Sequence, residues 1–202
     1  MTDPVAAQAR RRPEADAVVG HGARTWAEWN EQIDRAAATL AALGAERIAL
    51  RAEDRLDLAT LALGAIRAGV TGVLVPVRWP AALASESLAS AGLSVAVSDL
   101  PIPGLAIHAP ARLGAEVGAP GSEKPGSLAV FTSGSTGDPK AALLPWDALL
   151  ASADGVVSHL DLREGDRWLL DLPVAHVGGL GVVIRCAMAG AAMAIPEPER
   201  SP

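Results

Sequence analysis

Residues 132–140 carry the side chains and glycines needed to bind a phosphate group. The segment follows an apolar run and contains four hydroxyl side chains, two glycines and one lysine. Glycine tolerates positive φ and lets the backbone approach a ligand closely, and successive backbone N–H groups in such a turn form an anion-binding nest. Hydroxyl and ammonium groups add donors for phosphate oxygens. The segment therefore predicts a phosphate-binding loop, in which the residues expected to contact the nucleotide are Thr132, Ser133, Gly134, Ser135, Thr136, Gly137 and Lys140.

The spacing of these residues excludes several common motifs. A Walker A loop would need Gly-Lys-Ser/Thr, and a dinucleotide-binding fingerprint would need a glycine two residues before Gly134 or Gly137; neither is present. A hydrolase nucleophile elbow would need glycines two residues on both sides of Ser133 or Ser135, and these are also missing. A solvent-exposed turn remains the alternative to a phosphate loop, because glycine and serine are common in turns.

The elements that must position this loop alternate between strands and helices. Thr25 and Glu28 have the spacing of a capping box, which predicts a helix that runs from there to Gly44. Further helices are expected over residues 54–68, 81–91, 146–159 and 179–190. Strands are expected over residues 16–20, 47–51, 70–77, 93–97, 105–109, 127–131, 141–144, 167–170 and 191–195. This alternation predicts an α/β fold with parallel βαβ units.

A segment rich in proline and glycine, residues 98–126, interrupts the alternation. Clusters of these residues mark loops, because proline and glycine disfavour the interior of helices and strands. We therefore expect two parts. Residues 1–125 would form an N-terminal α/β subdomain that ends in this connection. Residues 126–202 would begin a second α/β subdomain that carries the phosphate loop.

The composition excludes other classes of protein. A net charge of −6 and a pI near 5.2 do not fit a nucleic-acid-binding surface. The longest apolar run, residues 178–195, contains Arg185 near its middle, where a charge costs about 2.5–3.5 kcal/mol in a membrane, so no membrane span is expected. Cys186 is predicted to be a small core residue, and the histidine spacing predicts no metal site. We expect a cytoplasmic protein.

The unbroken sequence of residues 132–140 resembles the signature loop of the adenylate-forming superfamily, which includes acyl- and aryl-CoA ligases and peptide-synthetase adenylation domains. Residues 24–28, 65–76 and 172–180 are similar to three further segments of that family. The resemblance implies that the loop binds the β- and γ-phosphates of ATP and that Lys140 is a catalytic residue, either as an electrostatic contact or as an anchor for the loop. It also implies a small carboxylic acid as substrate, with ATP, Mg²⁺ and CoA as cofactors.

His176 is the second candidate catalytic residue. It follows a proline and precedes an apolar helix, and a helix N-terminus disfavours the protonated imidazole. The resemblance implies that His176, Gly178 and Gly179 contact the acid substrate. A hydrogen-bonded structural histidine is the alternative, and the glycines equally allow close helix–sheet packing. Arg185 is expected to pair with a carboxylate or to extend toward solvent, and a second carboxylate of the substrate is a further possibility.

Residues 176–185 most resemble the branch of the family that ligates o-succinylbenzoate to CoA in menaquinone synthesis. The Tyr-Gly-x-Thr-Glu segment of the family does not occur in the 202 residues. We therefore expect the N-terminal part of a large domain, with the C-terminal domain absent and with a C-terminal half or a second copy as partner. Two hypotheses follow: an acid–CoA ligase, or a non-catalytic remnant that acts as a nucleotide-binding or interaction module.

Overall fold

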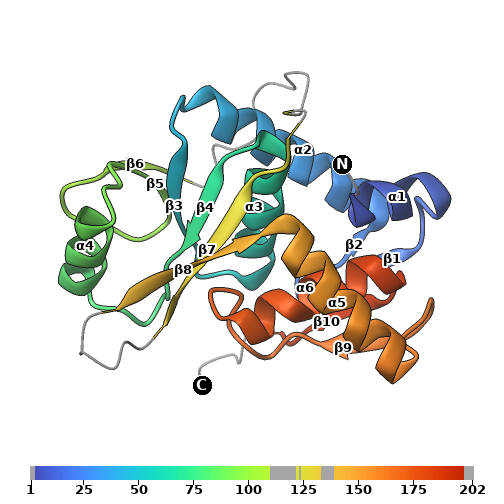
Figure 1. Cartoon of the computed structure of the whole chain (residues 1–202). Helices are drawn as coiled ribbons and strands as arrows, with labels where there is room; N and C mark the ends of the chain where they lie inside the picture. The colour runs from blue at the N-terminus through green and yellow to red at the C-terminus, as the bar shows by residue number, and fades with distance from the viewer. Residues whose placement is uncertain (1–2, 110–121, 123, 133–138, 198–202) are drawn as a thin grey trace.

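The computed structural model describes residues 3–109, 122, 124–132 and 139–197 (Figure 1). The described residues form two sheets with helices packed around them. The elements in chain order are α1 (Pro4–Arg11), β1 (Asp16–Gly20), β2 (Arg24–Thr25), α2 (Trp26–Ala42), β3 (Arg47–Arg51), α3 (Arg55–Ala68), β4 (Thr71–Leu74), α4 (Ala81–Ser90), β5 (Val95–Ser98), β6 (Ala106–His108), β7 (Ser127–Thr132), β8 (Lys140–Pro145), α5 (Trp146–Leu160), β9 (Arg167–Leu169), α6 (Val177–Ala189) and β10 (Ala192–Ile195).

The larger sheet, sheet B, has the strand order β6-β5-β3-β4-β7-β8. Its strands are parallel except for β8, which pairs with β7 in the antiparallel direction. Parallel sheets are covered on both faces, and Figure 1 shows α4 on one side of sheet B and α3 on the other. Ala84 and Leu88 of α4 belong to the apolar cluster on the first face, and α3 belongs to the main core on the second.

The smaller sheet, sheet A, has the order β2-β1-β10-β9 and brings together distant parts of the chain. Val18 of β1 lies opposite Met193 of β10. Gly20 ends β1 with a φ of +82°, and a Cβ atom at this position would collide with the carbonyl oxygen of Ile195. Both sheets combine strands from the two sides of residue 126, and the division of the chain at that residue stays a prediction.

Helix α3 lies at the centre of the core and is buried on nearly every side. A helix that is apolar all round must be covered all round. On one side Gly64 lets α3 approach α2, because a Cβ atom there would lie 2.8 Å from the Cβ of Ala36. Trp29 of α2 donates an indole hydrogen bond of 2.9 Å to the hydroxyl of Thr60, so these two buried polar groups are paired.

Arg67, near the end of α3, is the charged residue that this burial must accommodate. Its side chain is 7% exposed and forms salt bridges with Asp3 at 2.6 Å and Asp34 at 2.8 Å. Asn30 accepts two further hydrogen bonds, through its side-chain oxygen at 2.8 Å and its carbonyl oxygen at 3.1 Å. Asp3 also caps α1 by accepting the N–H of Ala6. The guanidinium therefore ties α1 and α2 to α3.

The structure confirms the predicted α/β class and most of the predicted elements. The capping box of Thr25 and Glu28 is formed, and Gly69 ends α3 in the left-handed conformation. The predicted strand over residues 70–77 is shorter, because Pro76 has no N–H to donate to a neighbouring strand. Helix α1 was not predicted, although Asp3 at its N-cap and Pro4 at its first position are recognised start signals.

We predict that the double variant Asp3→Asn, Asp34→Asn loses about 3–5 kcal/mol of unfolding free energy, because it leaves the buried Arg67 charge without a carboxylate. Asparagine still caps α1, so the change isolates the charge. Urea denaturation measures the loss. Glu31→Gln, which breaks an exposed pair with Arg35, is the control and should change stability by less than about 0.5 kcal/mol. A double variant as stable as this control would contradict the role assigned to Arg67.

Candidate functional site

The two residues that flank the central part of the predicted phosphate loop, Thr132 of β7 and Lys140 of β8, lie at the carboxyl edge of sheet B. Thr132 lies directly opposite Lys140 in the antiparallel register, and the Thr132 hydroxyl donates a hydrogen bond of 3.2 Å to the Lys140 carbonyl oxygen. Both residues are exposed. These two predicted contacts therefore form the base of the loop. The other predicted contacts, Ser133, Gly134, Ser135, Thr136 and Gly137, lie outside the described residues.

His176 is the N-cap residue of α6. Its Nδ1 atom accepts a hydrogen bond of 3.1 Å from the backbone N–H of Gly178, which satisfies one of the free donors at the helix start. An accepting Nδ1 carries no proton, so the neutral ring holds its proton on Nε2. The ring is exposed, and Nε2–H has no partner among the described residues. The hydrogen-bonded histidine of the alternative interpretation is thus present, with a donor left over for a ligand.

Gly178 and Gly179 differ in their surroundings. A Cβ atom on Gly179 would lie 2.6 Å from the carbonyl oxygen of Leu172 and would also collide with the backbone of Pro173. Gly179 therefore allows the turn before His176 to pack against α6. A Cβ atom on Gly178 would meet the end of the Leu172 side chain at 2.8 Å. Leu172 is 52% exposed. Contact of either glycine with a substrate stays a prediction.

Arg185 lies on the same face of α6 as Gly178 and Gly181, since residues three and seven apart share a helix face. Its guanidinium lies 5.5 Å from the centre of the Trp168 ring and covers Gly181. Among the described residues it has no salt bridge, so the expected carboxylate partner is not found there. Its neighbour Cys186 is fully buried, as predicted, and desolvation raises the pKa of the thiol to about 12.

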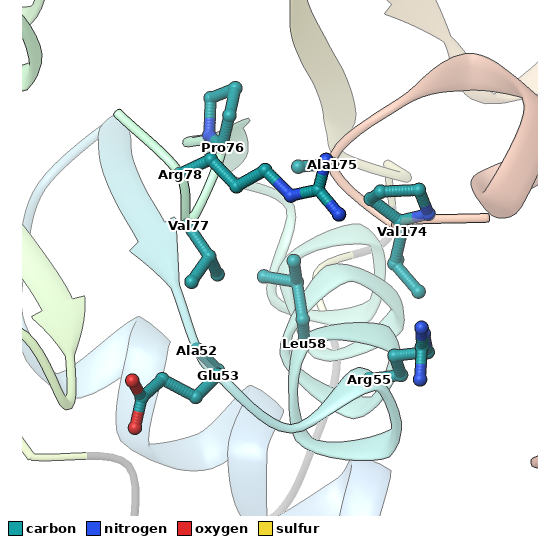
Figure 2. Close-up of a pocket in the computed structure, with 10 residues that line it drawn as sticks. Ala52, Glu53, Arg55, Leu58, Pro76, Val77, Arg78, Val174 and Ala175 are labelled. Carbon is teal, nitrogen blue, oxygen red and sulfur yellow. The ribbon is translucent and has the colours of Figure 1, made fainter. Parts of the chain in front are cut away.

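A cavity of about 280 Å³ is lined by segments that neighbour the predicted residues, but none of the described predicted site residues lines it. Residues 76–78, which follow β4 beside the phosphate-loop strand, form one wall, and residues 173–175, directly before His176, form the opposite wall. The start of α3 contributes Arg55 and Leu58. Figure 2 shows the Arg78 side chain extending toward Ala175. The walls are mainly apolar, and three charged residues, Glu53, Arg55 and Arg78, also line the cavity.

The two arginines of this cavity were not among the predicted site residues. Arg55 donates a hydrogen bond of 3.2 Å to the carbonyl oxygen of Asp171, whereas Arg78 has neither a hydrogen bond nor a salt bridge among the residues that the structure describes. The two residues belong to different elements and meet only in the folded chain. No local pattern in the sequence would have predicted their approach.

Comparison with known proteins decides the family. The AMP-binding enzyme family matches residues 5–202, which is nearly the whole chain. The chain belongs to the AMP-binding enzyme family. The 2-succinylbenzoate–CoA ligase of Escherichia coli K12 is 49% identical over 67 residues, which cover 33% of this chain and 15% of that protein. The long-chain-fatty-acid–CoA ligase FadD13 of Mycobacterium tuberculosis H37Rv is 31% identical over 192 residues, covering 82% of this chain and 38% of that protein.

Solved structures of the AMP-binding family have the same fold. The N-terminal domain of FACL13 from M. tuberculosis superposes with a TM-score of 0.85 at 26% identity, over 97% of this chain and 57% of that one. E. coli MenE bound to an analogue of OSB-AMS superposes with a TM-score of 0.82 at 27% identity, over 98% of this chain and 46% of that one. The chain thus spans about half the length of these relatives and corresponds to the N-terminal part of an adenylate-forming enzyme.

Membrane spans and metal sites were searched for among the described residues. None of the described helices is long and apolar enough to cross a membrane. The described part of the chain also contains no group of three or more His, Cys, Asp or Glu side chains arranged to hold a metal ion.

We predict that Gly179→Ala lowers the unfolding free energy by about 1–3 kcal/mol, because its methyl group would have to displace the backbone of residues 172–173. Gly155→Ala is the matched control. Gly155 lies in α5 with open space beside it, and alanine there should stabilise the chain by about 0.5–1 kcal/mol. Thermal and urea denaturation measure both effects. Wild-type stability of Gly179→Ala would show that the glycine is not needed for packing.

Proposed function

We propose that this chain carries the ATP-binding part of an acid–CoA ligase. The observation that supports this proposal is the match of the chain to the AMP-binding family together with the unbroken signature sequence of residues 132–140, whose described ends, Thr132 and Lys140, lie at the carboxyl edge of sheet B. In the proposed reaction an oxygen of the acid attacks the α-phosphorus of ATP, and the bond to pyrophosphate breaks. The CoA sulfur then attacks the acyl carbon, and AMP leaves.

The phosphate loop supplies donors to the nucleotide. Attack of a carboxylate on a phosphate brings two anions together, so fixed positive charge and hydrogen-bond donors must offset their repulsion. Lys140 and the hydroxyl of Thr132 stand at the base of the loop, where they suit the β- and γ-phosphates. Bound Mg²⁺ would neutralise further phosphate charge, and the proposal assigns no protein ligand to it. Residues 133–137 are proposed to complete the cradle.

The start of α6 is proposed to contact the acid. The Nε2–H of His176, which has no partner among the described residues, is a donor for a carboxylate. Gly178, at the start of the helix, leaves the face that it shares with Arg185 without a large side chain. Arg185, farther along that face, is a guanidinium available to a second carboxylate. o-Succinylbenzoate carries two carboxylates, and the E. coli relative with 49% identity over 67 residues is named a 2-succinylbenzoate–CoA ligase. We therefore propose o-succinylbenzoate, an acid of menaquinone synthesis, as the substrate.

The cavity beside residues 173–175 offers apolar walls, the guanidinium groups of Arg55 and Arg78, and the carboxylate of Glu53. Arg55 is paired with Asp171, so Arg78 is the cation left for a ligand among the described lining residues. This combination suits an anion with an apolar body, since the walls bury apolar surface and Arg78 pairs with charge. Both the acid and CoA fit that description. Changing Arg78 distinguishes them, because Arg78→Met should raise the KM of only the molecule that occupies the cavity.

Pyrophosphate exchange tests the proposal directly. The chain and the full product of its gene are assayed for exchange of labelled pyrophosphate into ATP with o-succinylbenzoate, an aryl acid and a fatty acid. Preferred exchange with o-succinylbenzoate would support the full proposal. Preference for another acid would refute the substrate but retain the ligase. A gene product that exchanges with no acid would refute catalysis.

A non-catalytic nucleotide-binding or interaction module is the second candidate. The 202 residues do not contain the Tyr-Gly-x-Thr-Glu segment, and the chain spans about half the length of the solved relatives. The coding sequence after Pro202 separates the candidates: a continuing frame with that segment and a late lysine favours the ligase. A C-terminal half or a second copy as partner and a cytoplasmic location likewise stay proposals.

We predict that Lys140→Ala weakens ATP binding about ten- to a hundredfold, which corresponds to one charge-assisted hydrogen bond of about 1.5–3 kcal/mol. Calorimetric titration with ATP measures it. Lys124→Ala removes the chain's other lysine and is the control. Equal ATP affinity in both variants would contradict the role of Lys140.

We predict that His176→Asn raises the KM for the acid more than the KM for ATP. Asparagine is a good N-cap residue, so α6 keeps its cap while the Nε2–H donor is lost. Steady-state kinetics of the full gene product, with thermal unfolding as a check on the helix, measure the two effects. Equal changes in both KM values would argue against a contact with the acid.

A further inference from the structure

Arg51, the last residue of β3, is a buried arginine that forms no salt bridge among the described residues. The residue is only 3% exposed. Its Nη2 atom donates two hydrogen bonds, of 2.8 Å to the carbonyl oxygen of Val77 and 2.7 Å to that of Trp79. Burial lowers the pKa of Arg51, and the charges of Asp99 and Glu53 oppose that change. Burying a cation costs folding free energy. We therefore ask what the two hydrogen bonds of Arg51 hold in place that an apolar side chain could not.

The segment held by Arg51 is the turn that follows β4. Within it, the N–H of Trp79 donates a hydrogen bond of 3.2 Å to the carbonyl oxygen of Pro76. The two carbonyl groups bound by Arg51 point back toward β3, so the guanidinium closes the turn over the carboxyl edge of sheet B. An apolar side chain at position 51 would leave both carbonyl oxygens without this partner.

Trp79 connects this turn to the phosphate-loop strand. Its ring lies 4.7 Å from the Phe131 ring, centre to centre, with a tilt of 50°. Phe131 is in β7, which is separated from β3 by β4. The next residue, Thr132, forms the base of the loop with Lys140. A continuous series of contacts thus runs from Arg51 through Trp79 and Phe131 to the residues that open and close the loop.

We propose that Arg51 is a positioning residue for the phosphate loop: it fixes the turn at residues 76–79, and Trp79 in that turn holds Phe131 and the base of the β7–β8 hairpin. The inference rests on the proposed function, in which this hairpin binds the phosphates of ATP. A loop that is already held in its binding geometry binds more tightly, because less ordering accompanies binding. Arg51 itself touches neither ATP nor the acid.

Hydrogen exchange of the 202-residue chain tests the positioning without requiring activity. In Arg51→Met we expect faster amide exchange in peptides that cover residues 76–79, 127–132 and 140–145, with unchanged exchange in β10. ATP affinity, measured by calorimetric titration, should fall about tenfold if a tenth of the molecules keep the binding geometry. Exchange that rises everywhere would indicate global unfolding and would overturn a local role.

Arg47 provides a matched control on the same strand. It is the first residue of β3 and also donates a hydrogen bond to a carbonyl oxygen, that of Ala91, at 2.8 Å. This contact lies at the amino end of the strand, away from the loop. Arg47→Met should leave exchange in residues 127–132 and 140–145, and ATP affinity, unchanged. Equal effects of the Arg47 and Arg51 variants would overturn the inference.

A second pair of variants follows the contacts past Arg51. Trp79→Ala removes the ring beside Phe131 and should reproduce the Arg51→Met pattern, whereas Trp79→Phe keeps a ring and should restore exchange and ATP affinity. The inference would be overturned if the β7–β8 hairpin exchanged its amide hydrogens at the wild-type rate in both Arg51→Met and Trp79→Ala. It would also be overturned if exchange in the hairpin became faster while ATP affinity stayed unchanged. Faster exchange in a chain whose wild type does not bind ATP would refute the proposed function while supporting Arg51 as the residue that positions the hairpin.

Discussion

The burial of α3 is the constraint on which the rest of the structure depends. This helix has an apolar surface on nearly all sides, so α2 and sheet B pack against it, and α6 belongs to the same continuous core. Enclosure is possible only because the single charged side chain deep in this helix, Arg67, has two carboxylates and a backbone carbonyl directed at it. Burying an arginine without such partners would cost several kcal/mol.

The same helix places the candidate site. Its buried length fixes its first turn, where Arg55 and Leu58 face the cavity, relative to sheet B. Val174 and Ala175, on the opposite wall, belong to the same core as α3. Core packing therefore helps to set the distance between the carboxyl edge of sheet B and the start of α6. A rigid framework of this kind suits a site that must align two reacting groups.

Local signals predicted most of the fold and only part of the candidate site. The alternation of apolar strands and helices, the capping box at Thr25 and the glycine that ends α3 depend on a few neighbouring residues, and all are readable from the sequence. The separate roles of Arg51 and Arg67 depend on which carbonyl or carboxylate groups the fold brings to them. Arg78 lines the cavity because the fold places residues 173–175 near it. Gly179 is intermediate: the glycine is visible in the sequence, but only the structure shows the backbone beside it.

The pairing of β1 with β10 has a consequence for the order of folding. The two inner strands of sheet A come from nearly opposite ends of the chain, whereas β3, β4 and β5 of sheet B pair with near neighbours in sequence. Contacts between distant residues form late, because a long loop must first be closed. On a ribosome, β1 emerges early but stays without its parallel partner until β10 has been synthesised. Until β10 has been synthesised, the unpaired β1 can associate with other chains, and α1 and β2 are the neighbouring segments that can cover it.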